Sequence, residues 1–295
     1  MELVAVKDWS SEIGATAYAE LEAGNILFFP EMPIEFSEDD RQFLLAQRRA
    51  DAPYHKNIAY RPQEDVLTGT ARGSGTERLR RIMRSFSEQS ARLLSRVLAR
   101  YAASWRLDYA SFRPHEEAGR HLRLHARNDL LHFDAFPTRP THGDRILRFF
   151  VNLHPEKPRV WVTTDSFPEL AERYASQAGL ARLARREHSP LGRLPRKLGI
   201  ARTRPAPYDT IMHCFHNFLK ENEEFQRNCP KQQWAFPPQS SWLVLTDMVC
   251  HAVLSGQMAL EQTFIVAWRS MLNPEWAPAA VLQRVTGLPV TDNNS

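Results

Sequence analysis

A histidine and an aspartate stand two residues apart inside a short apolar run of this chain. The run is Leu130-Leu131-His132-Phe133-Asp134-Ala135-Phe136. Residues i and i+2 of a β-strand point to the same face, so His132 and Asp134 can present an imidazole and a carboxylate together. An aspartate that faces an apolar interior is costly unless it is paired or bound to a metal. The spacing therefore predicts either a pair of metal ligands or a structural ion pair.

A third ligand is expected on a distant strand. His251 lies 119 residues after His132, in an apolar run (243–254) that ends before Gly256 and precedes another predicted strand. Two histidines and one carboxylate on one face of an octahedron are the ligand set of non-haem Fe(II) oxygenases. The opposite face of such an ion stays open for a bidentate keto acid and for O₂.

Other histidines compete for this third position. They are His121 and His125 in a predicted strand, His142 in a predicted loop before Asp144, His188 in a basic segment, and His213 and His216 on a predicted helix. The last two, three residues apart, could form a separate site. For all of them a satisfied or solvated imidazole is the simpler expectation. We select His251 because one strand positions it and a following strand supports it.

The elements that position these residues are mostly strands. Short β-rich runs cover 108–113, 122–127, 130–136, 146–153, 160–164, 241–249, 251–254 and 263–268. Strands at this spacing predict a barrel or sandwich rather than a parallel βαβ sheet. The predicted organisation is an N-terminal strand and helix support (1–106), a core (107–273) interrupted by a basic, helical insert (168–233), and a C-terminal tail (274–295). The fold class is therefore mostly β with flanking helices (α+β).

Helical periodicity is clearest over residues 76–105, where apolar residues recur at spacings of 3, 4 and 7. A second helix is predicted over 168–186, and Asp209 is predicted to cap a third.

Basic charge is concentrated in one segment. The chain has 295 residues, 38 of them Lys or Arg and 34 Asp or Glu, for a net charge of +4. Residues 182–204 alone carry a net charge of +7, so the rest of the chain has a net charge of −3. A 43% hydrophobic and 24% charged composition excludes collagen-like, low-complexity and wholly disordered chains. The segment suits an anionic partner, and nucleic acid is disfavoured because aromatic residues are not interleaved with the basic ones.

The sequence also predicts a compartment. The first residues lack a basic stretch followed by an apolar run, so no signal peptide is predicted. No run of about 18 apolar residues is long enough to span a bilayer. Three scattered cysteines (Cys214, Cys229 and Cys250) argue against a disulfide framework and favour a reducing cytoplasm.

Three stretches resemble one known family. They are 111–116, 130–140 and 145–153, combined with the order His132, Asp134, His251. The chain resembles the Fe(II)/2-oxoglutarate-dependent oxygenases and, within them, the hydroxylases of 3-deoxy-D-manno-oct-2-ulosonic acid (Kdo). The resemblance implies a double-stranded β-helix (jelly-roll) core and the cofactors Fe(II), 2-oxoglutarate and O₂. It also implies hydroxylation of the Kdo sugar of Kdo-lipid A, with succinate and CO₂ as co-products.

The resemblance also calls for a cation that binds the distal carboxylate of 2-oxoglutarate. Many relatives carry it about ten residues after the distal histidine, where this chain has Glu261 and Gln262. Two substitutes remain open: Arg148, with Asn152 on the same strand face, and Arg269, with Thr263 on its strand. Arg127 is the third candidate for binding this carboxylate, because its strand parity differs from that of His132 and Asp134. For both Arg148 and Arg269, a position on the outside of the core stays possible.

The basic segment is expected to contact the membrane that carries Kdo-lipid A. Arg193, Arg196 and Lys197 alternate with apolar residues, a pattern that suits an interfacial contact. We expect a cytoplasmic protein, peripheral to the inner face of the inner membrane, without an obligate protein partner. The alternative for the basic segment is a solvated loop. The alternatives for the function of the protein are an Fe(II)/2-oxoglutarate hydroxylase of a protein side chain or fatty acyl chain, and a non-catalytic β-barrel that binds anionic lipid.

Overall fold

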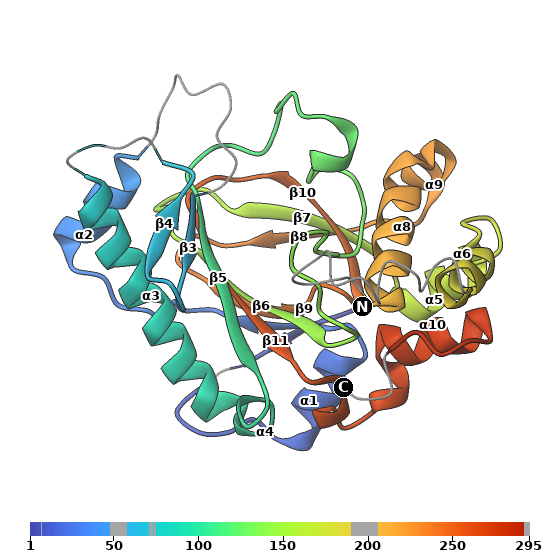
Figure 1. Cartoon of the computed structure of the whole chain (residues 1–295). Coiled ribbons are helices and arrows are strands. Elements are labelled where there is room, and N and C mark those ends of the chain that lie inside the picture. Colours follow the sequence, from blue (N-terminus) through green and yellow to red (C-terminus); the bar gives the residue numbers. More distant parts are fainter. Residues whose placement is uncertain (7, 48–57, 71–72, 74, 190–205, 292–295) are drawn as a thin grey trace.

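Two β-sheets form the centre of the molecule (Figure 1). The computed structural model describes residues 1–6, 8–47, 58–70, 73, 75–189 and 206–291. In these ranges the large sheet has the strand order β1-β2-β9-β6-β11-β5-β3-β4, and the small sheet has the order β10-β7-β8. β1 and β2 pair in parallel, and the other pairs are antiparallel. The fold is therefore mixed α/β with a large β-sheet.

The strands of the large sheet come from both halves of the chain. They are β1 (Leu3–Ala5), β2 (Ile26–Phe29), β3 (Ile58–Arg61), β4 (Val66–Thr68), β5 (Arg106–Arg113), β6 (Arg145–Asn152), β9 (Ser241–Leu245) and β11 (Ala259–Val266). The small sheet consists of β7 (Arg159–Ser166), β8 (Gln232–Phe236) and β10 (Val249–Ser255). The N-terminal region, expected as a support, thus supplies four strands of the large sheet, because β2 pairs with β9 and β3 pairs with β5.

Aromatic side chains fill the space between the two sheets. Phe150 of β6 and Trp242 of β9 stack at 5.2 Å, and Phe236 of β8 stacks on Trp242 at 3.9 Å between ring centroids. Trp161 of β7 packs edge-on against both Phe150 and Trp242. Neighbouring residues such as Phe149 point to the opposite face, as strand alternation requires.

Helices cover the outer face of the large sheet. α1 (Ala15–Glu22) and α3 (Thr76–Val97) pack there, and Figure 1 shows α3 running alongside β3, β4 and β5. The helix predicted over 76–105 ends earlier, since Leu98 leaves helical geometry and a separate turn, α4 (Ala99–Ala102), follows. α2 (Glu38–Leu45) begins after Ser37, whose side chain accepts a hydrogen bond from the Asp40 amide.

A second group of helices gathers at one end of the sheets (right side of Figure 1). These are α5 (Phe167–Tyr174), α6 (Leu180–His188), α8 (Pro207–Glu221), α9 (Glu223–Asn228) and α10 (Pro278–Thr286). The single helix expected over 168–186 is two helices, because Gly179 adopts φ +67° and starts α6 in a new direction. α10 lies in the expected tail and packs on α5 and α6. No helix of the described residues is long and apolar enough to cross a membrane.

Two expected strands are absent from the described residues at their predicted places. Residues 122–127 contain a 3₁₀ turn, η1 (Leu124–Ala126), and 130–136 makes only an isolated β-bridge at His132. Residues 130–136 do not form a regular strand because their main-chain hydrogen bonds go to different places. His132 bonds to His251 of β10, whereas the Asp134 amide donates to the carbonyl of Thr246, just after β9. The segment therefore crosses from one sheet to the other. Two further 3₁₀ turns, η2 (Trp268–Ser270) and η3 (Pro274–Trp276), follow β11.

Candidate metal centre and its cavity

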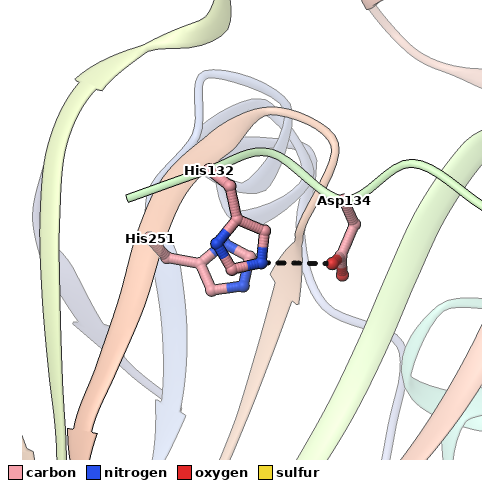
Figure 2. Close-up of side chains that lie close together, drawn as sticks. All are labelled: His132, Asp134 and His251. Atoms are coloured by element: carbon pink, nitrogen blue, oxygen red, sulfur yellow. Dashed lines mark ion pairs between the residues drawn. The ribbon is translucent and has the colours of Figure 1, made fainter. Parts of the chain in front are cut away.

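The crossing segment brings His132 and Asp134 up to His251. His132 and His251 exchange both main-chain hydrogen bonds, at 3.1 and 3.0 Å between nitrogen and oxygen. One ligand atom from each of the three side chains lies within 4.8 Å of the other two. Figure 2 shows the two imidazole rings side by side with the Asp134 carboxylate facing them, and His132 Nε2 is 3.8 Å from Asp134 Oδ1. The structure thus brings together the three residues that the sequence singled out.

Main-chain carbonyls orient both imidazoles. His132 Nδ1 lies 2.7 Å from the carbonyl oxygen of Leu130, and His251 Nδ1 lies 2.9 Å from that of Val249. An N–H at Nδ1 satisfies each contact, which leaves the lone pair of each Nε2 directed at the centre of the triad. Burial lowers the pKa of both histidines, so the neutral form that a metal requires is the one favoured here.

Asp134 is ionised despite its burial. Burial raises the pKa of its carboxyl, but the Arg148 guanidinium and then the two histidines lower it, and the result is well below the usual range. The Nε atom of Arg148 lies 3.3 Å from Asp134 Oδ2, and that oxygen is buried without a hydrogen-bond partner. Oδ2 thus lies beside Arg148, and Oδ1, which lies 3.8 Å from His132 Nε2, is available as a metal ligand.

Surrounding rings hold the triad in place. Trp161 stacks on His251 with 4.9 Å between ring centroids, and His216 of α8 packs edge-on against His132 at 5.0 Å. His216 Nδ1 also lies 2.6 Å from the carbonyl oxygen of Phe133. α8 therefore braces the irregular segment that carries two of the three triad residues.

A cavity of about 460 Å³ opens over the triad. Besides the triad, its wall includes the aromatic residues Phe150 and Trp161, the α8 residues His213, His216, Asn217 and Lys220, and the arginines Arg113, Arg120, Arg148 and Arg159. A cavity with this many cations suits anionic ligands. Sequence analysis missed all of these cations except Arg148. The signal that marked Arg148, an arginine on an inward strand position, also applies to Arg113 and Arg159.

Two buried glutamates link the arginines. Glu261 lies 2.9 Å from Arg113 and 3.6 Å from Arg148, measured between guanidinium nitrogen and carboxylate oxygen. Glu117 lies 3.5 Å from Arg159 in the same measure. Burial raises the pKa of both glutamates, but their arginine partners lower it further, so both are charged. Burial also lowers the pKa of Arg159 to about 10, despite Glu117 beside it, so its positive charge is only partly compensated.

The other expected cofactor residues lie elsewhere. Arg269 is in η2, with its guanidinium 5.3 Å from the ring centre of Trp268, and it does not line the cavity. Strand β11 ends at Val266, so the chain turns away before Arg269 can face inward. The Asn152 amide donates to three main-chain carbonyls, which occupies it within the β6–β7 and β8–β9 connections. Thr263 is buried opposite Arg148 but does not line the cavity.

The remaining candidates from the sequence divide between the cavity and the surface. His213, His216 and His125 line the cavity, whereas His142 lies 3.9 Å from Asp209 in a loop and His188 contacts the carbonyl of Pro289. Arg127 pairs with Asp129. Arg193, Arg196 and Lys197 lie outside the described residues.

The site defines a class of protein. Two neutral histidines and one carboxylate, with open space on the remaining side, are the ligand set of non-haem Fe(II) oxygenases. Arginine guanidinium groups beside them match the carboxylate groups of a keto acid. Both observations fit the iron and the 2-oxoglutarate that the sequence resemblance implies.

Comparisons with known proteins narrow this class to one family. The family model described as 3-deoxy-D-manno-oct-2-ulosonic acid (Kdo) hydroxylase matches residues 6–289. The chain belongs to the Kdo hydroxylase family, which confirms the resemblance. A search of curated proteins found no match.

Solved structures of one relative resemble the whole chain. The crystal structure of the Kdo hydroxylase KdoO, a non-haem Fe(II) alpha-ketoglutarate-dependent dioxygenase, in complex with alpha-ketoglutarate and Fe(III), is 30% identical with a TM-score of 0.85. That match covers 100% of this chain and 99% of the other. A KdoO complex with succinate and Fe(III) is also 30% identical, covers 99% and 98% of the two chains, and has a TM-score of 0.84.

Proposed function

We propose that this protein is an Fe(II)- and 2-oxoglutarate-dependent dioxygenase that hydroxylates the Kdo sugar of a Kdo-containing glycolipid, Kdo-lipid A. The observation that carries the proposal is the buried triad of His132, Asp134 and His251 at the base of a strongly basic cavity. The family of the chain supports the same activity.

The three triad residues would hold Fe(II). When bound, iron and 2-oxoglutarate supply the chemistry, in which the keto acid and O₂ give succinate and CO₂ and one oxygen atom enters a C–H bond of the sugar. The carbonyls of Leu130 and Val249 keep each Nε2 available as a ligand. Arg148 keeps Asp134 ionised, so the ligand set carries one negative charge against the two positive charges of the ion.

The arginines would bind 2-oxoglutarate and orient it. Arg113, Arg148 and Arg159 line one cavity and are held by ion pairs with Glu117 and Glu261. A guanidinium group can bind a carboxylate through two parallel hydrogen bonds, which fixes both position and direction. Arg159 is the strongest candidate for the distal carboxylate, because its charge is only partly compensated and its Nε is buried without a partner. The Nε of Arg148 also lacks a hydrogen bond, but it lies 3.3 Å from Asp134.

The two sheets support a double-stranded β-helix as the finer description of the core. Asn128 accepts a hydrogen bond from Val253 of β10, and His132 pairs with His251 on the same strand. Residues 128–132 would then act as a fourth, irregular strand of the small sheet, next to β10. Jelly rolls of this type pack two sheets face to face.

We place the protein in the cytoplasm at the inner face of the inner membrane, where the basic insert would meet the lipid substrate. The described part of the insert supports this, since Arg182, Arg185 and Arg186 are exposed on α6. Each basic residue near an anionic surface contributes about 1 kcal/mol. Charge reversal at Arg193, Arg196 and Lys197 should weaken flotation with anionic liposomes, and unchanged flotation would remove the membrane contact from the proposal.

The activity is tested by anaerobic loading with Fe(II) and 2-oxoglutarate, followed by O₂ and mass spectrometry of Kdo-lipid A. We expect a gain of one oxygen atom on the Kdo moiety, together with one succinate per turnover. The variant His132→Ala is the matched control and should form neither product. Succinate without oxygen gain would point to another substrate, and an unchanged signal in His132→Ala would refute metal-dependent catalysis.

A further inference from the structure

Lys220 of α8 is a buried cation without a carboxylate partner among the described residues. Its residue is only 4% exposed, and it lines the cavity over the triad. Nζ donates one hydrogen bond, to the carbonyl oxygen of His125 at 3.0 Å. An ammonium group has three donors, so two remain for a ligand. Burying a cation without a counter-ion is costly, which calls for an anion in the bound state.

The same face of α8 carries further unsatisfied polar groups. His213, His216, Asn217 and Lys220 follow one another at spacings of three, one and three residues, and all line the cavity. His213 Nδ1 and Asn217 Oδ1 are buried without a hydrogen-bond partner. These atoms suit the hydroxyl groups of a sugar, which both donate and accept hydrogen bonds.

The charges of the cavity leave room for another anion. Five cations line it, namely Arg113, Arg120, Arg148, Arg159 and Lys220. The carboxylates paired with the arginines are Asp134, Glu117 and Glu261. Divalent iron and dianionic 2-oxoglutarate cancel each other, so the loaded cavity keeps a positive excess.

Lys220 is placed to hold a substrate rather than the keto acid. It is outside the network of arginines and glutamates and comes from α8 instead of the sheets. It follows His216 by about one helical turn, roughly 5.4 Å along the axis, and His216 packs directly on the ligand His132. An anion bound by Lys220 would therefore lie close to the metal centre.

We propose that Lys220 anchors the carboxylate of the acidic sugar substrate, while His213 and Asn217 bind its hydroxyl groups. The inference rests on the proposed function and assigns the substrate side of the same cavity. It makes Lys220 a specificity residue, because a neutral sugar would leave its ammonium group unpaired.

The test compares Lys220→Met with wild type and with the control Lys231→Met. Lys231 is an exposed lysine that also donates one hydrogen bond to a main-chain carbonyl, that of Arg227. Calorimetry measures binding of Kdo and of its uncharged methyl ester to each protein, kept anaerobic with Fe(II) and 2-oxoglutarate. Turnover then gives the KM for Kdo-lipid A and for 2-oxoglutarate.

Wild type and Lys231→Met should bind Kdo at least tenfold more tightly than the ester, and Lys220→Met should lose this preference. The KM for Kdo-lipid A should rise at least tenfold in Lys220→Met, with the KM for 2-oxoglutarate within twofold of wild type. A wild type without preference for the acid, a Lys220→Met that keeps it, or a main effect on 2-oxoglutarate would overturn the inference. Failure of wild type to hydroxylate Kdo-lipid A would instead overturn the proposed function.

Discussion

Replacing Lys220 by methionine should stabilise the ligand-free protein, although it removes a predicted binding residue. Burial lowers the pKa of Lys220 from 10.5 to about 8, and the carboxylates of Asp134 and Asp129 offset this only in part. The difference corresponds to a cost of about 3 kcal/mol for folding with the ammonium group charged. Methionine has a similar length and carries no charge, so the variant avoids this cost.

The loss of one hydrogen bond offsets part of this gain in stability. The hydrogen bond from Nζ to the carbonyl of His125 disappears, at a cost of about 1 kcal/mol. The free energy of unfolding should therefore increase by about 2 kcal/mol at pH 7. At an unfolding entropy of roughly 2 cal/mol/K per residue, this raises Tm by about 3 °C in a chain of this length.

The stability gained by Lys220→Met should fall as the pH rises from 8 to 10.5. Below pH 8 the ammonium group is charged in both the folded and the unfolded chain, so its full burial cost is present. Between pH 8 and 10.5 the folded chain holds fewer protons than the unfolded chain, and the cost falls as pH rises. At pH 10 it is below about 1 kcal/mol, so Lys220→Met and wild type should have nearly equal stability.

Urea denaturation at pH 7 and pH 10, without metal or 2-oxoglutarate, measures both quantities. Lys231→Met serves as the control and should match wild type at each pH. A variant that is less stable than wild type at pH 7, or an equal gain at both pH values, would refute the account of Lys220 as an uncompensated buried cation. A gain in stability combined with a loss of substrate binding is typical of residues kept for function.

Three further predictions concern the site and a buried ion pair in the core. Fe(II) at 100 times its Kd should stabilise wild type by about 2.7 kcal/mol in anaerobic thermal unfolding, and an equal shift in His132→Ala would contradict its role as a ligand. Arg159→Met should raise the KM for 2-oxoglutarate at least tenfold and remove the increase in Tm that 2-oxoglutarate causes. Arg269→Met should behave as wild type. The reverse pattern would show that Arg269, and not Arg159, binds 2-oxoglutarate. Asp247→Ala should lower the free energy of unfolding, measured by urea denaturation, by about 3–5 kcal/mol. The reason is that the fully buried Arg145, whose Nε lies 2.7 Å from Asp247, loses its counter-ion. A loss below about 1 kcal/mol would show that the pair is solvated.

Sequence alone identified the features that depend on neighbouring residues. His132 and Asp134 stand two apart in an apolar run, and the structure brings both to His251. The helical period over 76–105 likewise predicted α3, since it needs only the apolar face of one helix. The family resemblance rested on stretches of the same local kind, and the family match confirmed it.

Tertiary structure decided the features that depend on distant partners. Segment 130–136 reads as a strand, yet the His132 amide bonds to β10 and the Asp134 amide bonds to the carbonyl of Thr246 just after β9, and this lets one short stretch supply two of the three triad residues. Periodicity could not reveal this crossing, because it depends on where β9 and β10 lie.

The basic wall of the cavity is also a tertiary feature. Arg113 meets Glu261 across 148 positions, and Lys220 meets the carbonyl of His125 across 95. Arg269 follows a strand with suitable parity, but that strand ends at Val266 and the next turn folds Arg269 onto Trp268. Sequence by itself therefore singled out the three candidate metal ligands and the class of chemistry. Only packing decided which cations line the cavity over the triad, because burial and ion pairing join residues that are far apart in the chain.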